Sequence, residues 1–270
     1  MTFSYAEVIG DPIAHSKSPL IHRFWLDALG IEGDYRATHV VPEGLGDYFA
    51  ARRADPAWRG CNITIPHKQA ALDHVEDRGG VRGTIGAINL ALVAEDGALI
   101  GTNTDAGGFY APIADLDLAG AAVAVIGAGG AARAVLFALS RIGVGPVTIL
   151  NRNVLKAAAL LSTFGLKGQA LPLGAPLPAA SLLVNTSALG MVGHPPLVID
   201  LSPLPEQALV YDLVYAPLET PLLAAARARD LDTVDGLEML IGQAALAFEL
   251  LFGAAPPRER DDELRGLLGG

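Results

Sequence analysis

The sequence predicts an α/β protein built from two α/β domains. Short apolar runs with the character of strands alternate with helix-like stretches almost from end to end. This alternation is typical of βαβ units and of largely parallel sheets. Two such series are present, one in the first third of the chain and a second that begins near residue 121. With 270 residues, of which 51% are hydrophobic, the chain has enough material for two cores.

The first series predicts an N-terminal domain with a mainly parallel sheet. Its elements are strands at residues 6–10, 35–41 and 60–65 and helices at residues 18–30 and 42–53. Two further apolar runs flank Asp96 and Gly97, a dipeptide favoured in tight hairpin turns. We therefore expect one antiparallel hairpin in this sheet.

The second series predicts a Rossmann-type domain. Its strands are expected at residues 121–127, 145–152, 181–187, 208–215 and 231–236. A long helical pattern at residues 236–252 is expected to pack back on the first domain, and the charged tail to form a short peripheral helix. We thus expect a substrate-binding domain of residues 1–104 plus 237–270 and a dinucleotide-binding domain of residues 105–236.

Composition excludes several classes of protein. The formal net charge of −10 and the pI near 5.0 give no electrostatic footprint for nucleic acid or an anionic membrane. The single cysteine, Cys61, excludes an intramolecular disulfide, and no cluster of residues predicts a metal. Apolar stretches stop well short of the ~20 residues that span a bilayer, and the first residues do not resemble a secretory signal. We expect a soluble cytoplasmic protein that acts on a small molecule as a monomer or a homodimer.

A glycine-rich loop at residues 127–132 lies between a buried-strand run and a helix-compatible run. Gly127 allows a tight turn, Gly129 lets the backbone approach a pyrophosphate, and Ala132 permits close helix–strand packing. The loop also contains Gly130 and Ala131. Because a second strand ends about 20 residues later, as the motif requires, we interpret the loop as a dinucleotide site. A structural turn and a methyltransferase-type loop are the alternatives.

The end of the second strand indicates the type of dinucleotide. Asn151, Arg152 and Asn153 stand where NAD-binding domains usually place an acidic residue for the ribose hydroxyls. A guanidinium there suits the 2′-phosphate of NADP, and Lys156 adds a second positive charge one turn later. The sequence therefore predicts NADP as cofactor, with a solvated surface arginine as the alternative.

Seven polar residues stand where a simple core would not place them: Ser16, Ser18, Thr64, Lys68, Asn89, Asp105 and Gln243. Five of them have a structural explanation, whereas the helix start that explains Ser18 does not explain Ser16. Ser18 suits a helix N-cap, and so does Asp105. Lys68 falls at the start of a predicted helix, where the macrodipole disfavours a cation, although an exposed lysine explains it equally well. Asn89 suits a satisfied core amide, and Gln243 suits an interhelical hydrogen bond.

Taken together, these segments resemble the shikimate dehydrogenase family, and the match covers nearly the whole chain in order. The matching motifs are VIGDPIAHSKSP, GCNITIPHK, GTNTDAGG, VIGAGGAARA, NRN, NTSALGM, YDLVYAPLETPLL and DGLEMLIGQAALAF. One such match is weak evidence, whereas eight in order are very specific. The resemblance implies a substrate domain made from both chain ends and a Rossmann-type domain between them.

The resemblance also implies an activity, the reversible NADP-dependent reduction of 3-dehydroshikimate to shikimate on the route to aromatic amino acids. The cofactor supplies the hydride, so the protein must orient the reactants and manage one proton. Lys68 and Asp105 would act at the reacting oxygen, the lysine as the acid and the aspartate as its partner. The implied substrate-binding residues are Ser16, Ser18, Thr64, Asn89, Tyr215 and Gln243. Asn185 and Thr186 would help to line the cofactor cleft, and Gly236 would lie close to the nicotinamide.

The sequence departs from the family pattern at Arg23, Leu90, Asn153 and Lys156, where Asn, Thr, Thr or Ser, and Arg are usual. The first two put the local substrate pocket in doubt, and the last two put the strength of NADP preference in doubt. Two alternatives remain, a quinate/shikimate dehydrogenase of broader specificity and a non-catalytic nucleotide-binding regulator. The missing acid after Arg152 opposes the NAD-using form, and the presence of both Lys68 and Asp105 opposes the regulator.

Overall fold

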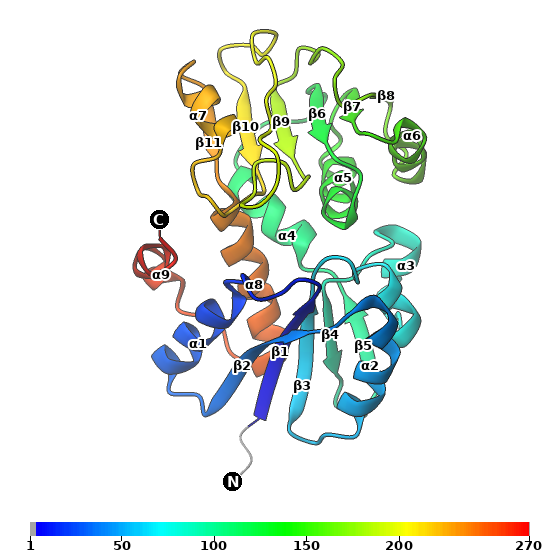
Figure 1. Cartoon of the computed structure of the whole chain (residues 1–270), viewed down its shortest axis with the longest axis vertical. Helices are drawn as coiled ribbons and strands as arrows, with labels where there is room; N and C mark the ends of the chain where they lie inside the picture. The colour runs from blue at the N-terminus through cyan, green and yellow to red at the C-terminus, as the bar shows by residue number, and fades with distance from the viewer. Residues whose placement is uncertain (1–3, 270) are drawn as a thin grey trace. The chain divides into compact units, whose positions relative to one another are not determined.

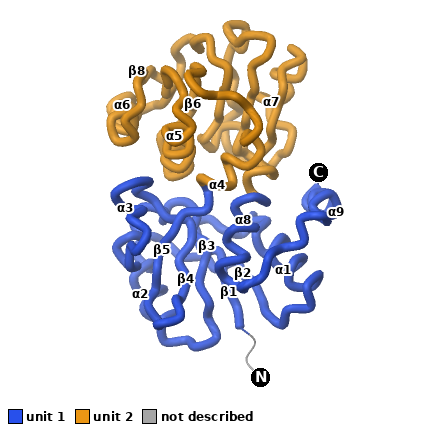
Figure 2. Tube along the Cα trace, turned by 180° about the vertical axis from the view of Figure 1, so that it is seen from behind, with its two compact units in different colours: residues 1–105, 241–270 blue, residues 106–240 orange. Residues whose placement is uncertain are grey.

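The computed structural model describes residues 4–269, and these fall into two α/β units. Unit 1 comprises residues 1–105 and 241–270, and unit 2 comprises residues 106–240 (Figure 2). The two divisions lie one residue and four residues beyond the domain boundaries expected from the sequence. The predicted α/β fold class is confirmed.

Unit 1 is built on a mixed sheet, in which the described residues form five strands. The strands are β1 (Ser4–Gly10), β2 (Gly33–His39), β3 (Trp58–Ile63), β4 (Leu90–Val93) and β5 (Leu99–Thr102), in the order β2-β1-β3-β4-β5 (Figure 1). β1 runs parallel to β2 and β3, whereas β4 runs antiparallel to β3 and β5. The predicted hairpin is therefore confirmed, and the sheet is less parallel than expected. This register places the ends of β1, β3 and β5 and the start of β4 at one edge.

Helices cover both faces of this sheet. The helical elements of the unit are α1 (Ser18–Leu29), η1 (Pro42–Gly44), α2 (Leu45–Arg53), η2 (Ala70–His74), α3 (Val81–Thr84), α8 (Gly236–Phe252, in unit 1 from residue 241), η4 (Arg258–Arg260) and α9 (Asp261–Leu267). Successive β1 side chains alternate between the faces, as a strand requires. Ala6 and Val8 pack with Ala247 and Leu251 of α8, so the C-terminal helix completes the core of unit 1 as predicted.

The opposite face buries a charged group. The carboxylate of Glu7 accepts hydrogen bonds from Thr38, Tyr48 and Arg52, at 2.6 Å, 2.7 Å and 2.6 Å. Burial by itself raises the pKa of Glu7, but the bonds from Arg52, Thr38 and Tyr48 outweigh burial and lower it. Glu7 thus joins β1 to β2 and α2 through an ion pair that is almost closed to solvent.

An aromatic cluster fills the space between α1 and the sheet. His22 is fully buried and stacks on Tyr35 with ring centroids 3.9 Å apart and planes 4° apart. Trp25 and Phe248 contact the same imidazole. Within residues 4–269, neither ring nitrogen of His22 has a hydrogen-bond partner. Burial lowers the pKa of His22 to about 3, which keeps the ring neutral at physiological pH.

Unit 2 contains a sheet of six described strands, all parallel. They are β6 (Val123–Ile126), β7 (Val147–Leu150), β8 (Gly168–Leu171), β9 (Leu182–Asn185), β10 (Leu209–Asp212) and β11 (Asp232–Val234). The spatial order is β11-β10-β9-β6-β7-β8, and when the strands are renumbered 1 to 6 in chain order and read from the β8 edge, it is 3-2-1-4-5-6. This is the order of dinucleotide-binding Rossmann folds. Only β8 has no counterpart among the strands expected from the sequence.

Helices cover both faces of this sheet too. They are α4 (Asp105–Tyr110, in unit 2 from residue 106), η3 (Ala111–Ile113), α5 (Gly130–Ile142), α6 (Val154–Thr163) and α7 (Pro221–Arg227). Val123 and Val125 of β6 pack in the cluster that contains α5 and α6, and Ala124 and Ile126 pack in the cluster that contains α7. A strand buried on both faces reads as a continuous apolar run, which is the pattern seen in the sequence.

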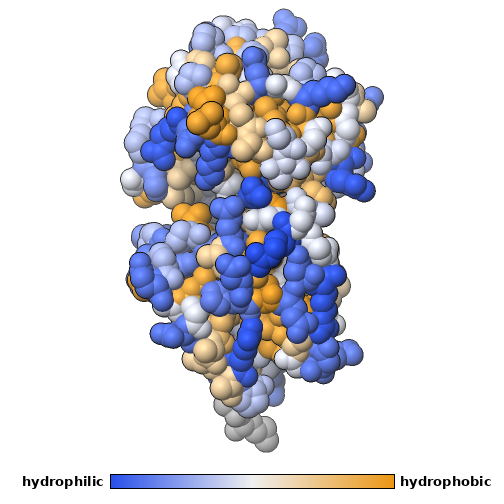
Figure 3. Space-filling model, turned by 90° about the vertical axis from the view of Figure 1, so that its right-hand side faces the viewer, coloured by the Kyte–Doolittle hydropathy of each residue, from blue (hydrophilic) through white to orange (hydrophobic). Residues whose placement is uncertain are grey.

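One face of the molecule shows how polar and apolar side chains are distributed on it. Hydrophilic side chains cover much of the face drawn in Figure 3, with smaller hydrophobic areas between them. In the part of the chain that the structure describes, no helix is both long enough and apolar enough to cross a membrane.

Candidate active site

A lysine–aspartate pair stands at the edge of the unit 1 sheet. Lys68 follows β3, and Asp105 follows β5 as the first residue of α4. The ammonium of Lys68 donates a hydrogen bond to Oδ2 of Asp105. Their side chains are 14% and 5% exposed, so the pair is shielded but open to a small molecule on the lysine side. The helix predicted to begin near Lys68 is instead a turn followed by the 3-10 helix η2.

Asn89 connects this pair to two other elements. Its side-chain amide donates to Oδ1 of Asp105 at 2.9 Å, to Oγ1 of Thr104 at 2.8 Å and to Oε1 of Gln243 at 3.1 Å. The side-chain oxygen of Asn89, Oδ1, accepts from the backbone N–H of Thr104 at 2.7 Å. The structure thus brings together four of the predicted residues, namely Lys68, Asn89, Asp105 and Gln243.

Two polar residues of this cluster escaped the sequence reasoning. Thr104 bridges Asn89 and Gln243, and Asn62 of β3 donates to the backbone carbonyl of Asn89 at 3.3 Å. Asn62 also accepts a hydrogen bond of 2.7 Å from the hydroxyl of Tyr35. The signal was present in the sequence, because Asn62 and Thr64 are two residues apart on a strand and so face the same side.

The hydroxyl residues lie at the same edge of the sheet. Thr64 follows β3 and packs so closely on β1 that a Cβ on Gly10 would lie 2.6 Å from its methyl group. Ser16 and Ser18 follow β1, which pairs with β3. The predicted N-cap role of Ser18 is wrong by one residue, since Ser18 is the first residue of α1 and no side chain caps the helix. Ser16 Oγ instead accepts from the backbone N–H of Ser18 at 3.3 Å.

The two unusual residues of unit 1 do not enter this cluster. Arg23 forms an exposed ion pair with Asp34 at 3.1 Å. Leu90 is fully buried in the core with Ala6, Val8 and Ala247. Neither side chain therefore takes part in the hydrogen bonds around Lys68 and Asp105.

The glycine loop of unit 2 has the geometry that an anion site requires. Gly127 has a φ of +106°, and a Cβ there would lie 2.7 Å from Oγ1 of Thr186, so only glycine fits. Gly129 precedes α5 and is exposed, with no atom within 4 Å of the Cβ it lacks. Gly130 and Ala131, both half-buried, begin α5, and Ala132 is fully buried against the sheet. The N–H groups at the start of α5 are thus presented in open space.

The end of β7 offers positive charge. Arg152 and Lys156 are exposed, and Arg152 forms no ion pair with any residue in the range 4–269. Asn153 caps α6 by accepting from the backbone N–H of Lys156 at 3.0 Å, and Asn151 donates to the carbonyl of Asn153 at 2.9 Å. The asparagines therefore shape the loop, and the two cations remain as the groups that suit a phosphate.

The remaining predicted residues lie in unit 2 at the ends of β9, β10 and β11. Thr186 donates to the carbonyl of Ile126 at 2.7 Å, Tyr215 is half-buried after β10, and Gly236 is buried at the start of α8. The Asn185 side chain is fully buried, and it donates to Asp212 at 2.8 Å and to the Leu189 carbonyl at 3.1 Å. This geometry favours a role for Asn185 in shaping the loop over direct contact with a cofactor.

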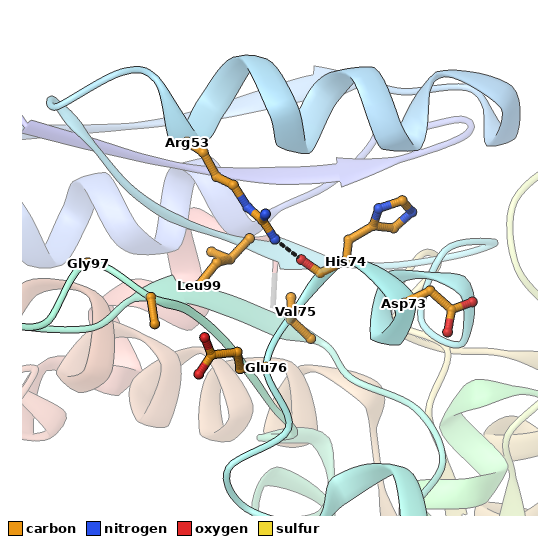
Figure 4. Close-up of a pocket in the computed structure, with 8 residues that line it drawn as sticks. Arg53, Asp73, His74, Val75, Glu76, Gly97 and Leu99 are labelled. Carbon is orange, nitrogen blue, oxygen red and sulfur yellow. Dashed lines mark hydrogen bonds between the residues drawn. The ribbon is translucent and has the colours of Figure 1, made fainter.

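A hollow of about 370 Å³ lies elsewhere in unit 1 and contains none of the predicted site residues. It is lined by Arg53, Asp73, His74, Val75, Glu76, Gly97, Ala98 and Leu99 (Figure 4). The Arg53 guanidinium donates to the backbone carbonyl of His74 across it. Since Gly97 and Leu99 lie at the start of β5, the hollow is at the opposite end of that strand from Asp105. Across residues 4–269, no group of three or more His, Cys, Asp or Glu residues is arranged to hold a metal ion.

The strand order, the glycine loop and the lysine–aspartate pair define a two-domain α/β protein of the dinucleotide-dependent dehydrogenase class. The chain belongs to the shikimate dehydrogenase family. It matches the model of the shikimate dehydrogenase substrate binding domain over residues 8–91. It also matches the models of shikimate / quinate 5-dehydrogenase over residues 111–175 and of the shikimate 5′-dehydrogenase C-terminal domain over residues 236–261.

Individual relatives agree with this assignment. The chain is 69% identical to the shikimate dehydrogenase (NADP(+)) of Sphingopyxis alaskensis, over 98% of this chain and 96% of that protein. Among solved structures it resembles the shikimate 5-dehydrogenase of Thermus thermophilus in complex with NADP(H) and shikimate, at 38% identity and a TM-score of 0.85, covering 98% of this chain and 100% of that one. It also resembles the quinate dehydrogenase of Corynebacterium glutamicum in complex with NAD, at 30% identity and a TM-score of 0.86, covering 98% and 99%.

Proposed function

We propose that this chain is an NADP-dependent shikimate dehydrogenase, which reversibly reduces 3-dehydroshikimate to shikimate in the biosynthesis of aromatic amino acids. The observation that carries the proposal is the Lys68–Asp105 pair, fixed by Asn89 in a chain 69% identical to a shikimate dehydrogenase (NADP(+)). The predicted activity, enzyme class and cofactor agree with the name of this 69% identical relative.

The residues of unit 2 fit NADP. Gly129, Gly130 and Ala131 place backbone N–H groups at the start of α5, where a pyrophosphate is favoured. Arg152 and Lys156 supply exposed positive charge for the 2′-phosphate, and residues 151–153 contain no carboxylate to repel it. When bound, NADPH supplies the hydride for reduction of the ring ketone.

The polar edge of unit 1 fits the substrate, which carries one carboxylate and several hydroxyl groups on a ring. Ser16, Ser18 and Thr64 offer hydroxyls that both donate and accept hydrogen bonds. Asn89 and Gln243 offer amides from two further elements. Because these groups come from different segments of one rigid unit, they orient a small polyhydroxylated ring without large rearrangement.

Lys68 acts as the general acid–base group of the reaction. In the reductive direction its ammonium donates a hydrogen bond to the ketone oxygen and then transfers a proton to the emerging alkoxide. Asp105 holds the ammonium by one oxygen, while its other oxygen is fixed by Asn89. In the oxidative direction the neutral lysine accepts the proton from the substrate hydroxyl. A positive charge beside the oxyanion lowers the barrier most where water is excluded, as at this shielded pair.

The proposal is tested by following NADPH absorbance with purified protein in four mixtures, shikimate or quinate with NADP or NAD. Rapid reduction of NADP with shikimate, and little in the other three mixtures, is the expected result. Turnover with quinate or NAD at a comparable kcat/KM would assign the broader-specificity branch of the family. A folded protein that binds nucleotide but turns over none of the mixtures would be a regulator, and the proposal would be wrong.

A further inference from the structure

A buried carboxylate in unit 2 has no role in the chemistry described above. Asp212, the last residue of β10, is fully buried, and all its hydrogen-bond donors are neutral. Its Oδ1 accepts from the side-chain amide of Asn185 at 2.8 Å and from the backbone N–H of Val214 at 3.0 Å. Its Oδ2 accepts from the hydroxyl of Thr220 at 2.7 Å.

A buried carboxylate without a positively charged partner reduces the stability of the folded protein. Burial raises the pKa of Asp212, and the bonds from Thr220, Val214 and Asn185 oppose this effect only in part. No positively charged side chain is among the groups that influence its pKa. An unpaired buried acid lowers stability relative to an apolar residue of similar size, so its presence calls for a compensating benefit.

The donors belong to the two connections that leave the carboxyl ends of β9 and β10. Asn185 ends β9, Val214 follows β10, and Thr220 caps α7 by accepting from the N–H of Leu223 at 3.2 Å. Asn185 in turn accepts from the N–H and the hydroxyl of Ser187, at 3.0 Å and 2.7 Å, and so fixes the loop after β9. Asp212 is therefore the central acceptor of a network at the carboxyl ends of parallel strands, where Rossmann folds bind their ligands.

The segment that Asp212 holds most directly is residues 213–215. The Asp212 carboxylate accepts from the backbone N–H of Val214, two residues later, and this hydrogen bond closes a short turn. The turn sets the direction of the backbone just before Tyr215. Gly236 packs on the same backbone, since a Cβ there would lie 2.5 Å from the carbonyl oxygens of Leu213 and Val214. Both Tyr215 and Gly236 are residues that the family resemblance assigns to the substrate and the nicotinamide.

We propose that Asp212 is a positioning residue for the dehydrogenase reaction, which orients the 213–215 segment, and with it Tyr215 and Gly236, through its two acceptor oxygens. This inference rests on the proposed function. Under this proposal, the conformation of the nicotinamide end of unit 2 depends on Asp212. The conformation of the 2′-phosphate end, at residues 151–156, does not.

The test compares Asp212→Ala with the wild type by two measurements. The first is kcat and KM for shikimate, and the second is the affinity for 2′,5′-ADP, which contains only the adenosine 2′-phosphate half of NADP. Loss of the acceptor is expected to lower kcat/KM for shikimate by about 10- to 100-fold, as for a small misplacement of reacting groups. The affinity for 2′,5′-ADP is expected to stay within about twofold, because a twofold change in binding is well under 1 kcal/mol.

A matched control is Asp200→Ala. Asp200 makes the same kind of turn in the same unit, accepting from the N–H of Ser202 at 2.9 Å, but it is exposed. This variant should have wild-type kinetics. Asp212→Asn keeps an oxygen for Asn185 and Val214 and should recover most of the activity that Asp212→Ala loses.

Three outcomes overturn the proposal. They are unchanged shikimate kinetics in Asp212→Ala, a parallel loss of 2′,5′-ADP affinity, which indicates general damage to unit 2, and an Asp212→Asn variant as impaired as the alanine variant. If Asp212→Ala does not fold, Thr220→Val replaces it, with Thr220→Ser as its control. A several-fold loss of kcat/KM in the valine variant alone, with 2′,5′-ADP binding intact, supports the proposal, and wild-type kinetics in it contradict the proposal. Wild-type protein inactive with shikimate and NADP would instead refute the proposed function itself.

Discussion

The side-chain amide of Asn89 donates a 2.9 Å hydrogen bond to Oδ1 of Asp105, while Lys68 binds the other oxygen of the same carboxylate. The carboxylate is therefore held from both sides, and its plane is fixed relative to the ammonium. A pair held in this way can keep one geometry through the catalytic cycle, which is the condition for efficient proton transfer.

Removal of either member of the pair should abolish most of the activity. We expect Lys68→Ala and Asp105→Ala each to lower kcat by about 10²-fold or more, the range for loss of a general acid–base group. Initial rates of NADP reduction with shikimate measure this. Lys167→Ala and Asp117→Ala change exposed residues of the same types and should leave kcat unchanged. Near-normal turnover in either site variant would remove that residue from the mechanism.

Asn89→Ala should impair both stability and activity. The substitution leaves buried acceptors on Asp105, Thr104 and Gln243 without their common donor. We expect a loss of about 1–3 kcal/mol in the free energy of unfolding, measured by urea denaturation, because the buried Oδ1 of Asp105 then loses the hydrogen bond from Asn89. The kcat/KM for shikimate should fall by at least about tenfold. A stable variant with wild-type kcat/KM would show that Asp105 keeps its orientation without Asn89.

Arg152→Gln should weaken NADP selectively. Hydrogen bonds to charged groups contribute about 1.5–3 kcal/mol, which corresponds to about a 10- to 100-fold rise in the KM for NADP. The low activity with NAD should change little, because NAD lacks the 2′-phosphate. Arg141→Gln, at an exposed position in the last turn of α5, is the control. An equal effect on both cofactors would place Arg152 outside the 2′-phosphate site.

The stability of unit 1 should decrease as the solution becomes more acidic, because of His22. The unfolded chain binds a proton at this residue near its ordinary pKa of 6.5, whereas the folded protein does so only at about 3. Stability from the neutral ring is thus complete above pH 6.5 and is lost as the pH falls from 6.5 toward 3, by about 1.4 kcal/mol per pH unit. Urea denaturation over this interval measures the slope, most cleanly above 4.5, the ordinary pKa of Glu7.

His22→Phe keeps an aromatic ring against Tyr35 and removes the titrating nitrogens, so the pH slope should become shallower. His194→Gln changes an exposed histidine and should retain the wild-type slope. If His22→Phe kept the full slope, another group would be responsible for the acid sensitivity.

Most of the strands that the sequence predicted are buried on one or both faces. All residues of β6 and β9 are buried, and their apolar runs made both strands visible. β8 was missed because its residues Gly168 and Gln169 are exposed at the sheet edge and show no alternation. The other edge strand, β11, was predicted although Asp232 is exposed, so exposure at an edge weakens the sequence signal without always removing it.

The candidate site was predicted unevenly for a similar reason. Lys68, Asn89, Asp105 and Gln243 stood out as polar groups in apolar surroundings, and the family motifs made them converge. Thr104 did not stand out from the sequence, and the spacing of Asn62 from Thr64 was a signal that was not used. The cap at α1 was misplaced by one residue, because the helix begins at Ser18 with Lys17 at the N-cap position, and no side chain caps it.

The two-part origin of unit 1 has a consequence for the order in which the chain matures. Ala6 and Val8 are synthesised before unit 2, yet their partners Ala247 and Leu251 are synthesised after it. All of unit 2, residues 106–240, emerges before those partners do and has its whole core available for folding. One apolar face of the N-terminal sheet therefore stays uncovered until helix α8 has been synthesised. During translation the inserted domain can be finished first, and the domain whose two segments flank it is completed only afterwards.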